Sequence, residues 1–463
     1  MSEGRFLSGS TMGHVVRMTA TGAFGITFVF LVDAANLFWI AQLGDPQLVA
    51  AIGFAFAIQF FSVSSGVGLM IASTAMISRS IGAGARNEAR VQAGAALATA
   101  VAVQAVVATL IVAFRHDLVA MAGADGETAA LAARYLAITV PSLVLMAVGL
   151  ICSGALRAEG YGAKAMYITL LSGALLMTVD PVLIYGLGWG LDGAAVGLVA
   201  FRFALLVLGL WFAARQHNLI ARPGVDQILR VLPVYLAIAV PAIATQMATP
   251  AGNYLLTIVI APFGDNAVAA WAVVGRLTVV AFGGIFALAA SIGGIFGQNF
   301  GAGRFDRLRS TYRDALTFCV VYTLTAWALL AAATPHIVRW FGLTSEGAGV
   351  LQAFTYAGVG AFVFLGALFV SNAAFNALGK PLRSAVLNWI KDGAVSLPAA
   401  LLLTGIWGAP GVIYGQAAAG ILVGAVSAVW GWRFVCGLRA EVPVALDAGP
   451  LRPYANPDRY RRR

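Results

Sequence analysis

Twelve long apolar segments run through the sequence, and they limit the possible folds more than any other feature. A helix needs about 20 apolar residues to cross the hydrocarbon core of a membrane, and the two-residue alternation of a transmembrane barrel is missing. The segments cover residues 14–42, 47–73, 90–114, 129–153, 163–186, 193–214, 230–261, 266–296, 314–333, 350–376, 381–406 and 410–436. The sequence therefore predicts an all-α polytopic membrane protein with twelve transmembrane helices.

The composition excludes the other broad classes. The 463 residues are 60% apolar and 10% charged, whereas soluble domains are roughly 45–50% apolar and 25% charged. A soluble chain of this size has no core large enough for so much apolar surface. Disorder requires low hydrophobicity and high charge, and three cysteines are too few for a disulfide scaffold.

The basic residues gather on one side of the predicted membrane. When both termini are placed in the cytoplasm, all but five of the 29 Lys and Arg residues fall in cytoplasmic ends and loops. Positive charge in cytoplasmic loops is what orients multi-pass proteins. We therefore expect an inner (plasma) membrane protein with both termini cytoplasmic. Its net charge of +10 then indicates contact with anionic headgroups of the lipid bilayer, and no nucleic acid partner.

The sequence aligns with itself when it is shifted by about 220 residues. The matching pieces are 43–45 (LGD) with 263–265 (FGD), 78–84 (SRSIGAG) with 297–303 (GQNFGAG), and 154–157 (GALR) with 376–379 (NALG). Each half holds six spans, so both halves have the same orientation and a pseudo-two-fold axis runs along the membrane normal. Such repeats are typical of secondary transporters, whose substrate path lies between the halves.

The repeat predicts the domain organisation. We expect an N-terminal cytoplasmic segment (1–13), a first lobe (14–214), a cytoplasmic linker (215–229), a second lobe (230–436) and a basic cytoplasmic tail (437–463). The loops 78–92 and 298–313 combine Gly-Ala-Gly with arginines, and we expect them to form helices on the membrane surface. A chain with two lobes needs no partner to form a path, so a monomer is expected.

These pieces resemble the multidrug and toxic compound extrusion (MATE) family over about residues 14–436. The resemblance rests on the order and spacing of short motifs, and within the family it points to the proton-coupled branch of the DNA-damage-inducible protein F type. The motifs are VD at 32–33 with LG at 43–44, ISRSIGAG at 77–84, GALRAEG at 154–160, DPVLIYG at 180–186, GQNFGAG at 297–303 and NALGKP at 376–381. The resemblance implies two six-helix lobes forming a V, and cation-coupled export by alternating access.

The resemblance also implies a coupling site in the first lobe. By position, Asp33 and Asp180 look like the acids that bind the coupling ion in proton-linked members. The family often has Asn four residues before the second acid, where this chain has Leu176. Spans seven and ten lack the acids of sodium-linked members, and Asn253 stands opposite Asp33 in the repeat. The expected coupling ion is therefore H+, with Na+ as the alternative, and no cofactor is expected.

Three charges lie inside the first-lobe spans at similar depth, namely Asp33, Asp180 and Arg202. A mid-span charge costs at least ~2.5–3.5 kcal/mol on insertion scales, so it usually has a function or a partner. One interpretation is a structural ion pair between Arg202 and Asp180. The other is a coupling site with one uncompensated negative charge, in which Asp33 titrates, Arg202 fixes Asp180, and Asn36 donates to Asp33 from the same helix face.

The remaining candidate residues concern the substrate path. A polar and aromatic cavity is predicted from residues of spans two and seven, while the second-lobe charges are predicted either to contact substrate or to stabilise packing. The prolines of span seven are predicted to form a gate, with static curvature as the alternative. The cavity candidates are Gln59, Ser62, Gln246, Met247, Asn253, Arg276, Lys391 and Asp392, and the gate candidates are Pro241 and Pro250.

Motifs of other functions are missing from the sequence. It holds no GxxxxGK[ST] phosphate loop, no HExxH and no paired Cys/His metal spacing, so we predict neither an ATP-driven pump, an enzyme nor a metal site. The leading hypothesis is a proton-coupled antiporter that exports small organic molecules of lipophilic, cationic or amphiphilic character. The alternatives are a flippase or exporter of a lipid-linked saccharide or acidic amphiphile, and sodium coupling.

Overall fold

The computed structural model describes residues 4–343 and 345–438, and in this part of the chain every regular element is a helix. Twelve helical spans are long and apolar enough to cross a membrane within the described residues. The helices are α1 (Thr11–Ala41), α2 (Pro46–Gly82), α3 (Arg86–Ala113), α4 (Arg115–Met121), α5 (Gly126–Thr139), α6 (Leu143–Glu159), α7 (Gly162–Pro181), α8 (Gly190–Leu210), α9 (Val225–Ile260), α10 (Asp265–Gly301), α11 (Phe305–Trp340), α12 (Ser345–Tyr356), α13 (Phe362–Ala377), α14 (Pro381–Trp389), α15 (Ser396–Trp407) and α16 (Pro410–Gly437). The predicted fold class is confirmed.

Several spans are built from two helices joined by a short turn of another helical type. The α5–α6 and α12–α13 spans are joined by 3-10 turns at Val140–Ser142 and Gly358–Ala361. Three π-helical turns extend or interrupt other spans, at Val182–Gly186, Trp211–Gln216 and Ile390–Val395. A π-helical turn leaves the regular hydrogen-bond ladder and is frequent at functional sites.

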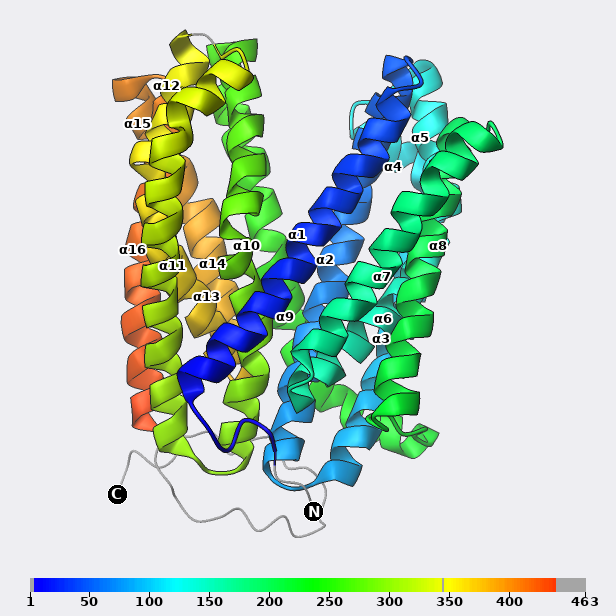
Figure 1. Ribbon diagram of the computed structural model, residues 1–463, viewed down its shortest axis with the longest axis vertical. Helices are drawn as coiled ribbons and strands as arrows, with labels where there is room; N and C mark the ends of the chain where they lie inside the picture. The colour runs from blue at the N-terminus through cyan, green and yellow to red at the C-terminus, as the bar shows by residue number, and fades with distance from the viewer. Residues whose placement is uncertain (1–3, 344, 439–463) are drawn as a thin grey trace.

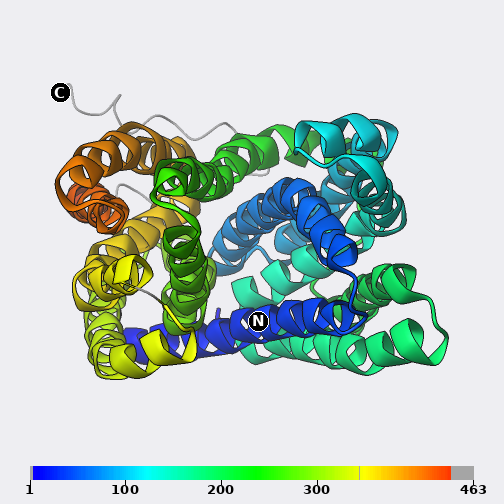
Figure 2. The same cartoon turned by 90° about the horizontal axis from the view of Figure 1, so that it is seen from above.

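The helices form two bundles, which diverge toward the end opposite the start of α1 (Figure 1). Helices α1–α8 make the first lobe and α9–α16 the second, and each lobe has its own apolar core. The first helix of each lobe reaches across to the other. Helix α1 packs against α10 and α11 as well as α7, and α9 packs against α2 and α3 as well as α14. Figure 2 shows these two helices along opposite sides of the molecule.

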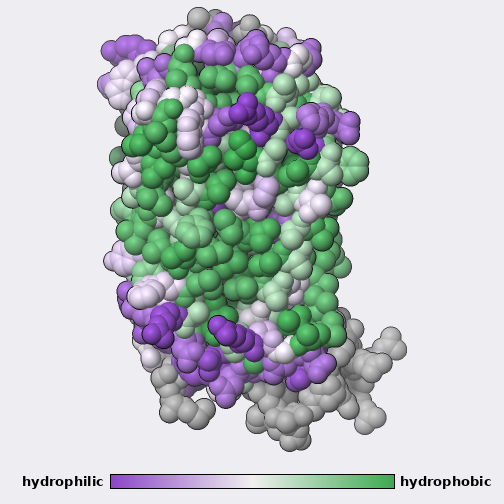
Figure 3. Space-filling view, turned by 90° about the vertical axis from the view of Figure 1, so that its right-hand side faces the viewer, coloured by the Kyte–Doolittle hydropathy of each residue, from purple (hydrophilic) through white to green (hydrophobic). Residues whose placement is uncertain are grey.

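An apolar band crosses the middle of the first-lobe side of the molecule. Figure 3 shows it on the side of the first lobe, with hydrophilic residues gathered toward both ends. Large apolar side chains such as Phe203, Val207 and Leu171 are exposed there, as expected for contact with lipid. We call the end at which α1 begins and α16 ends the terminal end, and the opposite one the open end.

The lobes meet at the terminal end through the two copies of the repeated motif. Arg79 at the end of α2 donates from Nε to the carbonyl of Ala377 (2.6 Å) and from Nη2 to that of Asn376 (2.9 Å), at the end of α13. Gln298 at the end of α10 donates from Nε2 to the carbonyl of Ala158 (2.6 Å), at the end of α6. The last carbonyls of a helix have no partner within it, so each lobe caps a helix of the other.

These two caps are related by the pseudo-two-fold axis. Arg79 and Gln298 are separated by 219 residues, and so are their acceptors Ala158 and Ala377. The glycines that end α6 and α13, Gly160 (φ 97°) and Gly379 (φ 88°), have the same separation. The match of 154–157 with 376–379 is therefore wrong by three residues, because the shared Ala and Leu letters of these segments allow a slipped alignment.

Glycines allow the backbones of α2 and α10 to touch beside the caps. A Cβ on Gly82 would collide with the carbonyl of Gln298, and one on Gly301 with the carbonyl of Arg79. Just beyond these contacts, α2, α10 and α13 leave a cavity of only about 10 Å³, too small to hold more than one water. The terminal end is closed between the lobes.

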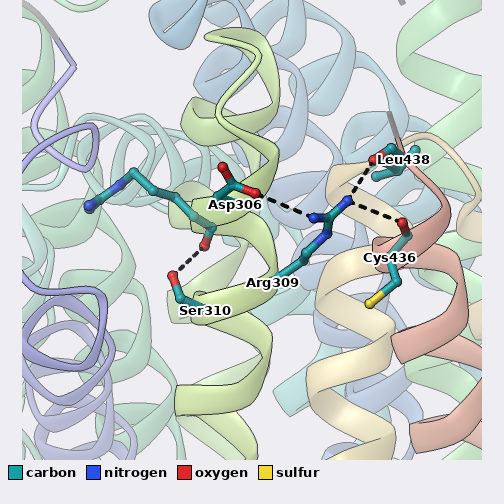
Figure 4. Close-up of polar contacts among 6 residues, drawn as sticks. Asp306, Arg309, Ser310, Cys436 and Leu438 are labelled. Carbon is teal, nitrogen blue, oxygen red and sulfur yellow. Dashed lines mark hydrogen bonds and ion pairs between the residues drawn. The ribbon is translucent and has the colours of Figure 1, made fainter. Parts of the chain in front are cut away.

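The loops at 78–92 and 298–313 do not form surface helices, and this prediction is wrong. Residues 78–82 continue α2 and residues 305–313 begin α11, with tight turns at Gly84 and Gly303. The helices run past the apolar segments because their polar ends make the contacts between the lobes. At the same end, Arg309 of α11 donates to the carbonyls of Cys436 and Leu438 and so caps α16 (Figure 4). The predicted basic tail lies outside the described residues from position 439 onward.

We predict that Gly301→Ala destabilises the protein, because the added methyl group has to push the backbones of α2 and α10 apart. Overpacking of this kind costs typically ~1–3 kcal/mol. The apparent melting temperature of the purified protein measures the effect. Gly293→Ala on the same helix is the matched control, since nothing lies within 4 Å of the position of its Cβ. Equal melting temperatures for both variants would contradict the close packing described here.

Candidate functional site

The structure places the carboxylate of Asp180 deep in the first lobe. Asp180 lies in the last turn of α7, just before Pro181 and the π-helical turn that follows, and its side chain is 1% exposed. Its Oδ2 accepts a hydrogen bond from Asn36 Nδ2 of α1 (2.6 Å). Its Oδ1 has no hydrogen-bond partner in the described part of the chain. A buried, half-satisfied carboxylate is costly in the charged form.

A glycine of α8 makes room for this carboxylate. A Cβ on Gly197 would collide with Asp180 Oδ1, the oxygen that lacks a partner. The α7–α8 contact is close at this level because Gly197 is buried and has no side chain. The position and rotamer of the Asp180 side chain therefore depend on Gly197.

Asp33 lies on α1, and its side chain is exposed. The prediction that Asn36 donates to Asp33 is wrong, because Asn36 reaches across to Asp180 instead. A spacing of three residues puts Asp33 and Asn36 on one side of α1, but Asp33 is exposed whereas Asn36 meets α7, whose Asp180 carboxylate supplies the acceptor. Asn36 thus links the helices that carry the two acids.

Arg202 does not pair with Asp180, so that part of the prediction is also wrong. Its guanidinium, 4% exposed, donates to three oxygens from other elements. The acceptors are the carbonyl of Thr139 (2.7 Å), Ser142 Oγ (3.0 Å) and Gln59 Oε1 (2.8 Å). The physical reason is the 3-10 turn at Val140–Ser142. The backbone N–H of Leu143, which a continuous α-helix would direct to Thr139, donates to Val140 instead, and the Thr139 carbonyl accepts from side chains.

The charge of Arg202 nevertheless acts on the coupling candidates. It interacts electrostatically with Asp33, and the nearly buried Tyr135 lies in the same part of the lobe. With Asp180, the site holds two carboxylates and one permanent cation, and of these Asp180 and Arg202 are buried. Sequence reasoning identified the three charges but missed Tyr135, Thr139 and Ser142. The proline in the middle of the fourth span was the signal that pointed to Thr139 and Ser142.

Of the predicted cavity residues in the first lobe, Gln59 belongs to this network and Ser62 lies beside it. Gln59 is 4% exposed and donates from Nε2 to Thr139 Oγ1 (3.1 Å), besides accepting from Arg202. Ser62 is 2% exposed, and its carbonyl accepts from Gln104 (3.0 Å). Both side chains are buried in helix packing, so neither faces an open surface in this conformation.

In the second lobe, the structure brings Lys391 and Asp392 together. They form an ion pair within the π-helical turn of span eleven, and both side chains are nearly buried. Asp392 also accepts from Thr249 Oγ1 of α9 (3.2 Å) and packs against Gly252. These contacts join α9 to the π-helical turn. Of the two predicted roles, they favour the stabilisation of packing over contact with substrate.

The other second-lobe candidates lie apart from this pair. Arg276 of α10 and Asn253 of α9 are exposed, and Gln246 and Met247 are half-buried. Helix α9 continues through Pro241 and Pro250 without a break, so the gate stays a prediction. The non-helical residue within a long helix is Phe282 of α10 (φ −114°, ψ 15°). It precedes Gly283 and Gly284, a pair that favours a bend.

A family model described as MatE matches residues 23–182 and 241–402, one segment in each lobe. The chain belongs to the MatE family. It is therefore a multi-pass membrane transporter and not an enzyme, as the sequence predicted. The two matched segments include Asp33 and Asp180 in the first lobe and Lys391 and Asp392 in the second.

Individual relatives match over most of their length. The chain is 26% identical over 434 residues to the FAD transporter of Shewanella oneidensis, covering 92% of this chain and 95% of the relative. It is 22% identical over 390 residues to the multidrug export protein MepA of Staphylococcus aureus, covering 82% and 84%. Among solved structures, the outward-facing conformation of a multidrug resistance MATE transporter matches with a TM-score of 0.88 at 21% identity, covering 95% and 99%.

We predict that Gly197→Ala displaces the Asp180 carboxylate and impairs transport while the protein still inserts into the membrane. The added methyl group and Asp180 Oδ1 cannot occupy the same space, so the carboxylate must rotate away from Asn36. Transport activity per unit of inserted protein measures the effect. Gly53→Ala in the same lobe is the control, because nothing lies within 4 Å of that position. Full activity in Gly197→Ala would show that the placement of the carboxylate is unimportant.

We predict that Asp392→Asn destabilises the protein more than the double variant Lys391→Met, Asp392→Asn. Breaking a buried ion pair by removing one partner typically costs ~3–5 kcal/mol, whereas replacing both partners is often nearly neutral. Apparent melting temperatures of the two variants and the wild type measure this. If instead both variants are stable but transport is lost, the pair serves substrate binding and not packing.

Proposed function

We propose that this protein is a proton-coupled antiporter that exports small organic molecules, and that Asp33 and Asp180 carry the coupling proton. It resides in the inner membrane with both termini in the cytoplasm, since the positive charges gather at the terminal end. The single observation that carries the proposal is the buried Asp180 carboxylate, which has one oxygen on Asn36 and the other without a partner. Protonation removes the charge and supplies a donor at that oxygen.

The charge balance favours one exchangeable cation in the first lobe. Asp33, Asp180 and Arg202 together carry one net negative charge when both acids are ionised. Desolvation of the buried Asp180 carboxylate favours its protonated form. Asn36 connects the two acid-bearing helices, so a change in the protonation of Asp180 alters the α1–α7 contact directly.

A proton fits this site better than a sodium ion. Sodium needs several oxygen ligands, and the neutral oxygens of Thr139, Ser142 and Gln59 are occupied by Arg202, whose guanidinium stays charged. Among the described residues, no group of three His, Cys, Asp or Glu side chains is arranged to hold a metal ion. Sodium coupling is the alternative that the transport experiment below tests.

The arrangement of the lobes supports alternating access. The lobes diverge at the open end and are sealed at the terminal end by the Arg79 and Gln298 caps. With the terminal end in the cytoplasm, this conformation faces outward. Opening toward the cytoplasm requires that both caps break, and the pseudo-two-fold axis lets the lobes rotate symmetrically while they do so.

The substrate class is proposed as lipophilic cations or amphiphiles, by analogy with the relative named as a multidrug export protein. An anionic or amphiphilic substrate, exported or flipped between leaflets, is the second candidate. It is favoured by the exposed Arg276 of the second lobe and by the relative named as a FAD transporter. Both candidates use the same coupling site, so the choice between them does not affect the role of Asp180.

We predict that Asp33→Asn and Asp180→Asn each abolish uphill transport that is driven by a pH gradient. An amide side chain does not ionise near neutral pH, so it cannot bind and release the coupling proton, and the pH gradient cannot drive transport. The measurement uses proteoliposomes loaded with a fluorescent lipophilic cation, under an imposed pH gradient or an imposed sodium gradient. The control is Asp117→Asn, an exposed acid outside the helical spans. Undiminished pH-driven transport in both variants, or transport driven by sodium alone, would contradict the proposal.

A further inference from the structure

A pocket of about 430 Å³ lies at the terminal end, at the start of α1. Its wall is formed partly by residues 4–10, which precede α1 and which we call the strap. The strap crosses from one lobe to the other before α1 begins. The pocket is lined by Gly4, Arg5, Phe6, Ser8, His14, Arg17, Met18 and Gly160.

The second lobe holds the strap in a fixed conformation. Arg307 of α11 donates to the carbonyls of Phe6 (2.9 Å), Ser8 (3.2 Å) and Gly9 (2.9 Å). The backbone N–H of Phe6 donates to Gln298 Oε1 (3.0 Å), the same side chain that caps α6. The Phe6 ring is 2% exposed. The pocket wall is therefore an ordered part of the contact between the lobes.

The pocket is strongly basic. Arg5, His14 and Arg17 line it, and no acidic side chain does. The guanidinium of Arg5 lies 3.9 Å from the centre of the Tyr161 ring, which stacks on His217. Burial and then the positive charges of Lys164 and Arg5 lower the pKa of His217. The positive potential thus extends over this corner of the first lobe.

The two arginines of the pocket have donors to spare. Both residues are exposed, and within the described part of the chain neither guanidinium makes a hydrogen bond or an ion pair. Two arginines and a histidine that line one pocket suit a tetrahedral oxyanion, because the planar fork of Arg matches phosphate oxygens. The volume falls in the range of small-ligand pockets, about 300–1,000 Å³.

From these observations we propose that the pocket binds a phosphate group, and that the phosphate belongs to an anionic phospholipid. Phe6 and Met18 give the pocket an apolar side next to its basic side, as the junction of headgroup and acyl chain requires. The pocket lies at the start of α1, the first candidate membrane span, and the end of a span is where a membrane protein meets lipid headgroups.

A bound phosphate would join the strap to α1 and to the first lobe. Arg5 belongs to the strap and Arg17 to α1, while the strap itself is tied to the second lobe through Arg307 and Gln298. The lipid would thereby stabilise the conformation that is closed at the terminal end. Anionic lipid in that leaflet then favours the outward-facing state and slows its opening toward the cytoplasm.

The test measures lipid binding by the purified full-length protein. The protein is titrated with phosphatidylglycerol, with phosphatidylcholine and with inorganic phosphate, and bound lipid is counted by native mass spectrometry while thermal stabilisation is recorded. We expect phosphatidylglycerol to bind and stabilise, and phosphatidylcholine to do neither. In the double variant Arg5→Gln, Arg17→Gln we expect the Kd for phosphatidylglycerol to rise at least about tenfold. Hydrogen bonds to charged groups contribute ~1.5–3 kcal/mol, and about 1.4 kcal/mol is a tenfold change in Kd.

Two further variants make the outcome decisive. Arg215→Gln removes an exposed charge from the same end of the same lobe but outside the pocket, and it should bind phosphatidylglycerol like the wild type. Arg17→Gln alone keeps the contact of Arg5 with Tyr161, so it reports on binding if the double variant unfolds. Equal losses in Arg215→Gln and in the pocket variants would show only a diffuse charge effect and would overturn the site. Stabilisation by inorganic phosphate as strong as by phosphatidylglycerol would overturn the lipid as its source.

Discussion

The carbonyls at a helix end need donors, and inside a membrane protein water does not supply them. In this chain, α6 and α13 end at the boundary between the lobes, and each finds its donor on the opposite lobe, in Arg79 or Gln298. The rest of the architecture depends on this exchange. The two caps join the lobes at the terminal end, while the lobes diverge at the open end. They also bring the two copies of the repeated motif into contact.

The two halves of the repeat share their backbone features but differ in their charged residues. Caps, turn glycines and the 3-10 turns recur in both lobes at nearly the same separation. The charges do not recur, because Asp180 and Arg202 stand opposite Ala399 and Ile421, and Lys391 and Asp392 have no charged counterparts. A symmetric frame allows both lobes to move alike, while an asymmetric charge distribution confines the proposed coupling to one of them.

The sequence was sufficient to predict the spans, the repeat and the buried acids, because apolar length and charge inside a span are properties of one helix alone. It was insufficient for the partners of those charges. The depth of Arg202 and Asp180 along their helices agreed, but depth says nothing about direction around the helix axis, and Arg202 turned out to face Thr139. The partner of Asn36 was missed for a similar reason. The sequence placed Asn36 on the same side of α1 as Asp33, but it did not show that α7 packs beside α1 there. The strap at residues 4–10 had no signal, because its conformation is set by Arg307, some 300 residues away.

The most direct test of the central claim is to count the protons that the purified protein releases when it binds substrate. Wild-type protein in weakly buffered detergent solution receives a lipophilic cation such as tetraphenylphosphonium, and a pH-sensitive dye records the change. The account predicts the release of up to one proton per molecule, because Asp33, Asp180 and Arg202 together carry one net negative charge when both acids are ionised, and no release from Asp180→Asn. Unchanged proton release in Asp180→Asn and Asp33→Asn would place the exchangeable proton elsewhere and contradict the account.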